Sequence, residues 1–180
     1  MRVVKTITIL IGRKIKMTIK EQLKEMFTMQ KALNEAILKE FGQDSITGEK
    51  LQLAIIDELG ELTHELKGDW CWWKKTQKPV DRKRVLEELV DVYHFVMTFE
   101  LIFYPNGIED ILSSYRFYIE TFGEGISGRL DDFIINVSYN GNKLAQLLDL
   151  TERLGFSFDE VYQEYINKNR ENYDRLARGY

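Results

Sequence analysis

LEELVDVYHF, residues 86–95, is the part of the sequence that constrains the architecture most. It lies in a run from Arg82 to Phe103 that contains neither proline nor glycine, and this run is predicted to form one long, largely apolar helix. Glu88 and Asp91 are three residues apart, so both carboxylates are expected on the same face of that helix. An unpaired carboxylate is costly to bury among apolar residues, which indicates that this pair has a partner.

A second pair of carboxylates precedes this stretch. The sequence ELGEL at residues 58–62 places Glu58 and Glu61 three residues apart on a helix predicted from Thr47 to about Lys67. If the two helices pack antiparallel, four carboxylates converge, and such a cluster of like charges favours a divalent cation. Mg²⁺ prefers oxygen ligands and is commonly held by carboxylates together with substrate phosphates. One such pair is most often a solvated helix face, but two pairs in succession indicate a metal site.

The chain after residue 17 is predicted to form one all-α domain, a multi-helix bundle spanning residues 18–180. Thr18 begins the first helix, where Glu21 completes a capping box, and the turn signature at residues 41–45 ends it. Gly68-Asp69 is expected to end the second helix, before an aromatic and basic loop at residues 70–81. The further predicted helices span residues 108–128, 130–154 and 157 or 159 to about 176.

Composition limits the classes of function. The chain has 180 residues with a formal net charge of −4, which gives no reason to expect a nucleic acid or an anionic membrane as partner. The single cysteine, Cys71, excludes an intramolecular disulfide, and two histidines are too few for a His-rich zinc site. The apolar segment at residues 3–11 is too short and too interrupted for a signal peptide. We therefore expect residues 1–17 to be an extension, either a strand, a disordered arm or a start-site artefact with Met17 as an alternative start, and we expect a cytoplasmic protein.

Several motifs together resemble a known family, the dimeric dUTPases of the all-α NTP pyrophosphatase (MazG-like) superfamily. The two acidic pairs indicate only the superfamily. The sequences WCWWK at residues 70–74 and YINKNRENYDR at residues 165–175, followed by Gly179-Tyr180, are more specific to dUTPases. The sequence QKALN at residues 30–34 resembles the first-helix motif of the family. The resemblance runs from about residue 18 to the C-terminus.

The resemblance implies a Mg²⁺-dependent diphosphatase that hydrolyses dUTP, and also dUDP, to dUMP with release of pyrophosphate or phosphate. It implies that all four carboxylates bind metal and that Glu61 also activates the attacking water. The implied metal ligands are Glu58, Glu61, Glu88 and Asp91. The implied substrate-binding residues are Gln30, Asn34, Trp70, Trp73, Lys74, Phe95, Lys168, Asn172 and Arg175.

Spacing supports some of these roles independently. Lys168, Asn172 and Arg175 are four and three residues apart, so one helical face offers an ammonium, an amide and a guanidinium to a phosphate. Gln30 and Asn34 also share a face, and amides carry both the donor and the acceptor that a uracil edge requires. Without the resemblance, a charged surface helix explains the first set better than a phosphate site does, and a polar helix face explains the second set nearly as well as a base site does. The tryptophans also suit core or dimer contacts.

Three other functions stay open at this point. A related pyrophosphatase acting on another nucleotide such as dCTP would use the same metal site. A phage or bacterial regulatory partner, such as a repressor, would suit a binding protein on this scaffold, and a purely structural bundle would need none of the carboxylates. The apolar residues of the run up to Phe103, among them Phe99 and Ile102, exceed what one small core needs, so we predict a homodimer.

Overall fold

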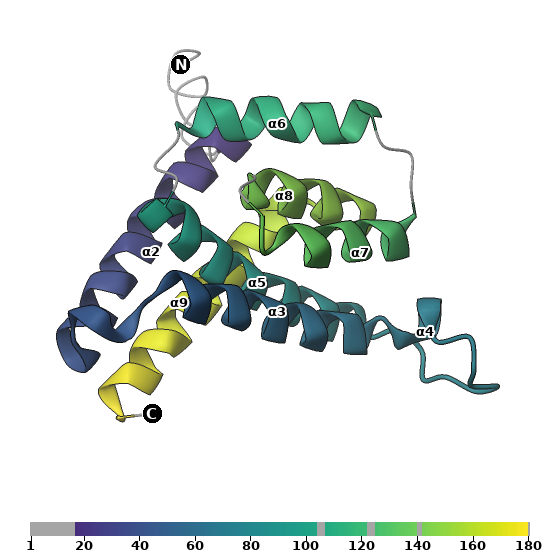
Figure 1. The fold of residues 1–180 in the computed structure, drawn as a ribbon, viewed down its shortest axis with the longest axis horizontal. Coiled ribbons are helices and arrows are strands. Elements are labelled where there is room, and N and C mark those ends of the chain that lie inside the picture. Colours follow the sequence, from purple (N-terminus) through teal and green to yellow (C-terminus); the bar gives the residue numbers. More distant parts are fainter. Residues whose placement is uncertain (1–16, 104–106, 122–124, 140–141, 180) are drawn as a thin grey trace, which may run out of the picture.

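A computed structural model of the chain describes residues 17–103, 107–121, 125–139 and 142–179, and every regular element in these ranges is a helix (Figure 1). The expected all-α class is therefore confirmed for the described part. In chain order the elements are α2 (Ile19–Phe41), the 3₁₀ turn η1 (Gln43–Ser45), α3 (Gly48–Glu65), α4 (Lys67–Trp70), α5 (Arg82–Phe103), α6 (Ile108–Thr121), α7 (Ile126–Asn136), α8 (Lys143–Arg153) and α9 (Phe158–Ala177).

Two helices begin where local side chains satisfy their first N–H groups. At α2 the Thr18 side chain accepts from the Glu21 N–H while the Glu21 carboxylate accepts from the Thr18 N–H, as predicted. Ser157 and Glu160 make the same capping box at α9. The expectations for residues 1–16 lie outside the described residues.

The prediction of one helix over residues 130–154 is wrong. The chain instead forms α7 and α8, and α7 begins at Ile126, within the segment predicted to end the preceding helix at residue 128. Asn142 caps α8 by accepting from the Ala145 N–H, and the Glu100 carboxylate of α5 accepts from the Leu144 N–H at 3.3 Å. These two acceptors satisfy backbone N–H groups in the first turn of α8, and a new helix therefore begins there.

The second helix also ends earlier than predicted. α3 stops at Glu65, and the Leu66 N–H closes it on the Leu62 carbonyl at 3.2 Å. Gly68 and Asp69, which were expected to break the helix, belong to the four-residue α4.

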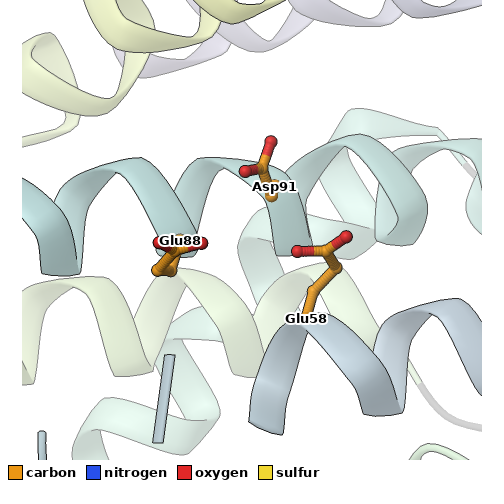
Figure 2. A group of neighbouring side chains, drawn as sticks. All are labelled: Glu58, Glu88 and Asp91. Atoms are coloured by element: carbon orange, nitrogen blue, oxygen red, sulfur yellow. The ribbon is translucent and has the colours of Figure 1, made fainter. Parts of the chain in front are cut away.

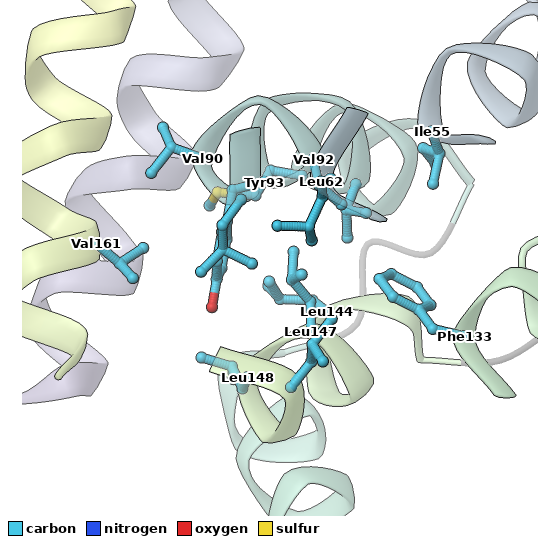
Figure 3. Close-up of a cluster of buried hydrophobic side chains, with 14 of the residues drawn as sticks. Ile55, Leu62, Val90, Val92, Tyr93, Phe133, Leu144, Leu147, Leu148 and Val161 are labelled. Carbon is cyan, nitrogen blue, oxygen red and sulfur yellow. The ribbon is translucent and has the colours of Figure 1, made fainter. Parts of the chain in front are cut away.

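The core forms around α5, which contacts α2, α3, α8 and α9. Figure 3 shows Val92 and Tyr93 of α5 meeting Leu144 and Leu147 of α8, with Phe133 of α7 beside them. All five side chains are at most 1% exposed. Most of the apolar surface of α5 is thus covered within the chain, although Ile102 and Phe103 stay 44% and 43% exposed. None of the described helices is both long and apolar enough to cross a membrane.

Candidate active site

Three of the four predicted metal ligands converge. α3 and α5 pack side by side (Figure 1), and carboxylate oxygens of Glu58, Glu88 and Asp91 lie within 4.8 Å of one another (Figure 2). The helical spacing of the acidic pairs makes this possible, because it aims both carboxylates of α5 at the facing helix. We call these three residues the carboxylate cluster. Glu61 is exposed and outside it, yet close enough for its charge to raise the pKa values of Glu58 and Glu88.

The carboxylate cluster resists full ionisation. Burial raises the pKa of Glu58 to about 7, and the negative charges of Asp91, Glu61 and Glu88 add to the effect. Burial also raises the pKa values of Glu88 and Asp91, against the lowering effect of nearby cations. A divalent cation would relieve this repulsion, so the donor set is the kind that a hard metal ion fits.

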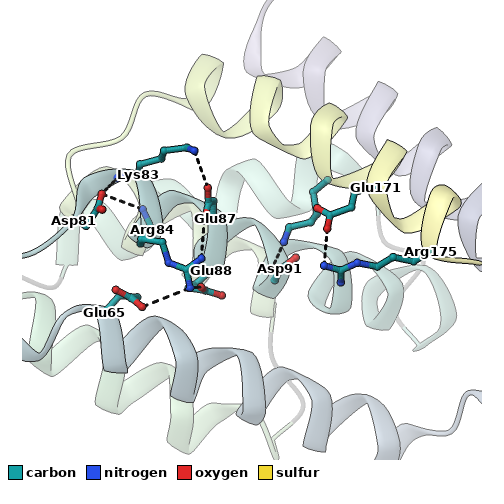
Figure 4. A network of polar contacts seen from close by, with 10 residues as sticks. Glu65, Asp81, Lys83, Arg84, Glu87, Glu88, Asp91, Glu171 and Arg175 are labelled. Atoms are coloured by element: carbon teal, nitrogen blue, oxygen red, sulfur yellow. Dashed lines mark hydrogen bonds and ion pairs between the residues drawn. The ribbon is translucent and has the colours of Figure 1, made fainter. Parts of the chain in front are cut away.

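Two cationic side chains border the carboxylate cluster (Figure 4). Arg84 of α5 places Nη2 at 2.7 Å from Oε1 of Glu88, and it also contacts Glu65 of α3 at 3.7 Å. Lys168 of α9 places Nζ at 2.7 Å from Oδ2 of Asp91. α9 therefore carries a positive charge to the edge of the carboxylate cluster.

A pocket of about 350 Å³ adjoins the cluster, within the range typical of small-ligand sites. One part of its wall is ionic and includes Glu58 and Asp91 of the cluster. Another part is polar and buried, and the remainder is apolar. The lining residues are Gln30, Leu33, Asn34, Ile37, Phe41, Ile46, Leu51, Glu58, Asp91, His94, Phe95, Thr98, Asn172, Arg175 and Leu176. A flat ring in the apolar part, and an anionic group between Arg175 and a cation held by the carboxylate cluster, would suit this arrangement.

The structure thus brings together most of the residues predicted to bind substrate, but it does not bring all of them to this pocket. Trp70, Trp73, Lys74 and Lys168 are not among the described residues that line it, although Lys168 reaches Asp91 on its wall. Figure 1 shows α4 at the far end of α3 from the C-terminal half of α9. Trp70 is half-buried and donates from Nε1 to the Thr63 carbonyl at 2.8 Å, whereas Trp73 is 55% exposed. Lys74 lines a separate cavity of about 700 Å³.

The sequence did not identify Arg84, Thr98 and Tyr165 as site residues. Arg84 lies one turn before Glu88, a spacing that would have predicted its ion pair. Thr98 lies one turn after His94, on the face that meets α2. Tyr165 reaches Gln30 across 135 positions of sequence, so no local pattern could have predicted that contact.

Comparison with known proteins identifies the family of the chain. A family model described as dUTPase matches residues 22–180, which cover the carboxylate cluster and the pocket. No match was found among curated proteins. The chain therefore belongs to the dUTPase family, and it is a hydrolase of the nucleotide diphosphatase class.

Proposed function

We propose that this protein is a Mg²⁺-dependent dUTP diphosphatase that also hydrolyses dUDP, forming dUMP. The observation that carries the proposal is the carboxylate cluster at the edge of a pocket with buried amide groups and an apolar wall. Together with the family, this arrangement accounts for a polyphosphate and a base in a single site. A purely structural bundle would gain nothing from three partly buried, mutually repelling carboxylates.

The cluster residues fit Mg²⁺ by their chemistry. Glu58, Glu88 and Asp91 would supply hard oxygen donors, and Glu61 would join them from the next turn of α3. The raised pKa of Glu58 supports this proposal, because a bound cation would offset both of its causes, burial and the negative charges of the neighbouring carboxylates. Bound there, Mg²⁺ would neutralise phosphate charge and make an attacking water more acidic.

The chain's own residues would do the rest of the chemistry. Lys168, Asn172 and Arg175 of α9 would hold the phosphates, with Lys168 exchanging part of its interaction with Asp91 for a phosphate oxygen. Glu61 is exposed beside the cluster, so we propose it as the base that takes the proton of the attacking water. Phe95 on the pocket wall would pack against the deoxyribose, and Asn34 would meet the base.

We also propose a homodimer. The outer face of α3 presents Leu53 and Ile56, which are 66% and 40% exposed, and no atom lies within 4 Å of a side-chain carbon built at Gly60. A second copy would cover this apolar face. Trp73 and Lys74 lie in an exposed segment beyond the end of α3. In such a dimer they would contact the nucleotide site of the partner subunit.

The test is a substrate panel. Release of pyrophosphate or phosphate is measured for the four common dNTPs, dUTP and dUDP, in Mg²⁺ and then in EDTA. We expect turnover of dUTP and dUDP in Mg²⁺, loss of turnover in EDTA, and a loss of about 100-fold or more in Glu61→Gln. Glu49→Gln is the matched control, since Glu49 is an exposed carboxylate at the start of the same helix.

The other outcomes separate the rival functions. Preferred turnover of dCTP or another nucleotide would keep the metal site and overturn the uracil assignment. No turnover of any nucleotide would overturn the enzymatic proposal and favour a protein-binding role on this scaffold.

A further inference from the structure

Arg84 contacts three carboxylates at the border of the carboxylate cluster (Figure 4). Its Nη1 donates to Oε2 of Glu87 at 3.0 Å, and its Nη2 donates to Oε1 of Glu88 at 2.7 Å. Nη2 also lies 3.7 Å from Oε1 of Glu65, across the contact between α5 and α3. A separation of 3.7 Å is too long for a hydrogen bond, so Nη2 is bonded to Glu88 and lies next to a second carboxylate.

The two carboxylates beside Nη2 differ in their surroundings. The Glu88 side chain is 7% exposed and belongs to the carboxylate cluster, whereas the Glu65 side chain is 27% exposed and lies outside it. Burial raises the pKa of Glu88, and the positive charge of Arg84 opposes that shift. Arg84 therefore supplies positive charge to a carboxylate that a metal ion would also need.

Arg84 and a metal ion would compete for Glu88. Both are cations, and a metal bound to the cluster would lie close to the guanidinium that is paired with one of its ligands. Like charges repel more strongly where burial reduces the screening by solvent. The guanidinium therefore disfavours metal binding as long as it stays on Glu88.

Arg84 has both the room and a second partner that it needs to leave Glu88. Its side chain is 51% exposed and lines the cavity of about 700 Å³, which Glu65 also lines. A shift of about 1 Å would bring Nη2 within hydrogen-bond distance of Glu65. The hydrogen bond from Nη1 to Glu87 can persist during such a shift, because it involves the other nitrogen of the guanidinium.

We propose that Arg84 is a positioning residue that exchanges partners when a metal ion binds. Nη2 pairs with Glu88 in the metal-free protein and with Glu65 in the metal-bound protein. The exchange frees Glu88 for the metal and keeps the guanidinium paired, so Glu65 contributes to metal affinity without being a ligand. The inference rests on the proposed function, of which it requires only the metal at the carboxylate cluster.

The first experiment measures the Kd of Mn²⁺ by electron paramagnetic resonance on the full-length protein without nucleotide. Mn²⁺ accepts the same oxygen ligands as Mg²⁺. We expect Arg84→Gln to bind Mn²⁺ about 5-fold or more tightly than the wild type, because the competing charge is removed. We expect Glu65→Gln to bind it about 3-fold or more weakly, because the guanidinium loses its second partner.

The matched control is Lys83→Gln. Lys83 is an exposed cation that precedes Arg84 on α5 and pairs with Glu87 at 3.3 Å. We expect this variant to change the Kd by less than about 2-fold, because an exposed pair is well screened by solvent. A tightening as large as that of Arg84→Gln would show that any nearby cation has the same effect, and would overturn the specific role of Arg84.

A double-mutant cycle separates the exchange from a simple effect of charge. If Glu65 acts by receiving Arg84, then Glu65→Gln should have a much smaller effect on the Kd when it is combined with Arg84→Gln. An equal effect of Glu65→Gln in both backgrounds would show that Glu65 acts only through its own charge, and the exchange would be overturned.

Thermal unfolding separates the exchange from a purely structural ion pair. Arg84→Gln leaves Glu88 without its counter-charge, so we expect a lower Tm in EDTA at pH 8. We also expect a larger increase in Tm on adding Mn²⁺ than the wild type shows, because the variant binds the ion more tightly. A Tm that is lowered equally with and without metal would mean that the pair is only structural.

Two further outcomes would overturn the inference. Weaker Mn²⁺ binding in a folded Arg84→Gln variant would show that Arg84 stays on Glu88 and orients it for the metal. Absence of Mn²⁺ binding in the wild type would remove the metal that the exchange requires. Absence of dUTP turnover in a wild type that binds Mn²⁺ and shows the expected coupling would instead remove the proposed function and leave the exchange in place.

Discussion

Glu58 is the residue at which burial and charge act together on the carboxylate cluster. Its position was predictable, because a three-residue spacing on a helix is a local property of the sequence. The hydrogen bonds of Gln30 were not, since its partners His94 and Tyr165 are 64 and 135 positions away. Sequence predicted that Gln30 binds the base, and the structure shows both the nitrogen and the oxygen of its amide hydrogen-bonded to protein side chains.

Removing the charge of Glu58 should stabilise the protein without metal and inactivate it. Glu58→Gln keeps the shape of the side chain and relieves repulsion within the cluster, so we expect a higher Tm at pH 8 in EDTA. We also expect dUTP turnover in Mg²⁺ to fall about 100-fold or more, because a ligand is lost. Thermal unfolding and steady-state assays check both effects, and a variant that is stabilised but fully active would contradict the proposed role of the cluster.

Stability should depend on pH in opposite directions with and without metal. The pKa of Glu58 is raised to about 7 in the folded chain, so the folded state holds a proton that the unfolded state releases near its ordinary pKa. This contribution to stability is present below the unfolded pKa and is lost as the pH rises through about 7. In EDTA the Tm should therefore fall between pH 5 and pH 8, and Glu58→Gln should flatten the fall.

When Mg²⁺ is present, the stability of the folded chain is expected to rise with pH instead of falling, because metal binding requires the ionised carboxylates. The increase in Tm on adding Mg²⁺ should be small at pH 5.5 and larger at pH 8. An increase that is equal at both values would show that Glu58 does not take part in binding the ion.

Among the helices, the boundaries that depend on contacts close in the sequence were predicted, and a boundary that depends on a distant contact was not. The starts of α2 and α9 are set by capping boxes within four residues. The box at α2 was predicted, and of the two starts predicted for α9, Ser157 or Asp159, the structure has Ser157 as the cap. The break between α7 and α8 was not predicted, because Glu100, one of the two acceptors at the start of α8, lies 44 positions from the residue it caps.

Glu100 should be essential for that junction. It is 2% exposed and accepts from the Leu144 N–H. Burial lowers the pKa of Lys143, which is itself fully buried, and the negative charge of Glu100 opposes that shift. Glu100→Ala would leave a buried ammonium without its counter-charge, and we expect a loss of about 3–5 kcal/mol in the free energy of unfolding. Urea denaturation measures this loss.

The matched control is Glu109→Gln, which removes the exposed ion pair between Lys20 and Glu109. Surface pairs contribute about 0–1 kcal/mol, so its effect should be far smaller. Equal effects of the two variants would mean that Glu100 does not support the start of α8.

In the whole molecule, the apolar surface of α5 that suggested a dimer is mostly buried within the chain, and α3 exposes Leu53 and Ile56 on its outer face. Light scattering should give the mass of a homodimer. Leu53→Glu should lower that mass toward one chain, because a charge in a buried apolar contact is unfavourable.

Ile19→Glu, which adds the same charge at the exposed start of α2, should leave the mass unchanged. A wild-type mass of a single chain at micromolar concentration would contradict the proposed dimer.

The central claim is that the carboxylate cluster binds the metal on which dUTP hydrolysis depends. The most direct measurement is the rate of pyrophosphate release from dUTP as Mg²⁺ is titrated, for the wild type, Glu58→Gln and the control Glu49→Gln. We predict saturable activation by Mg²⁺ in the wild type and the control, and in Glu58→Gln a rate that stays about 100-fold or more lower at all Mg²⁺ concentrations. Equal Mg²⁺ activation of all three proteins would contradict the claim.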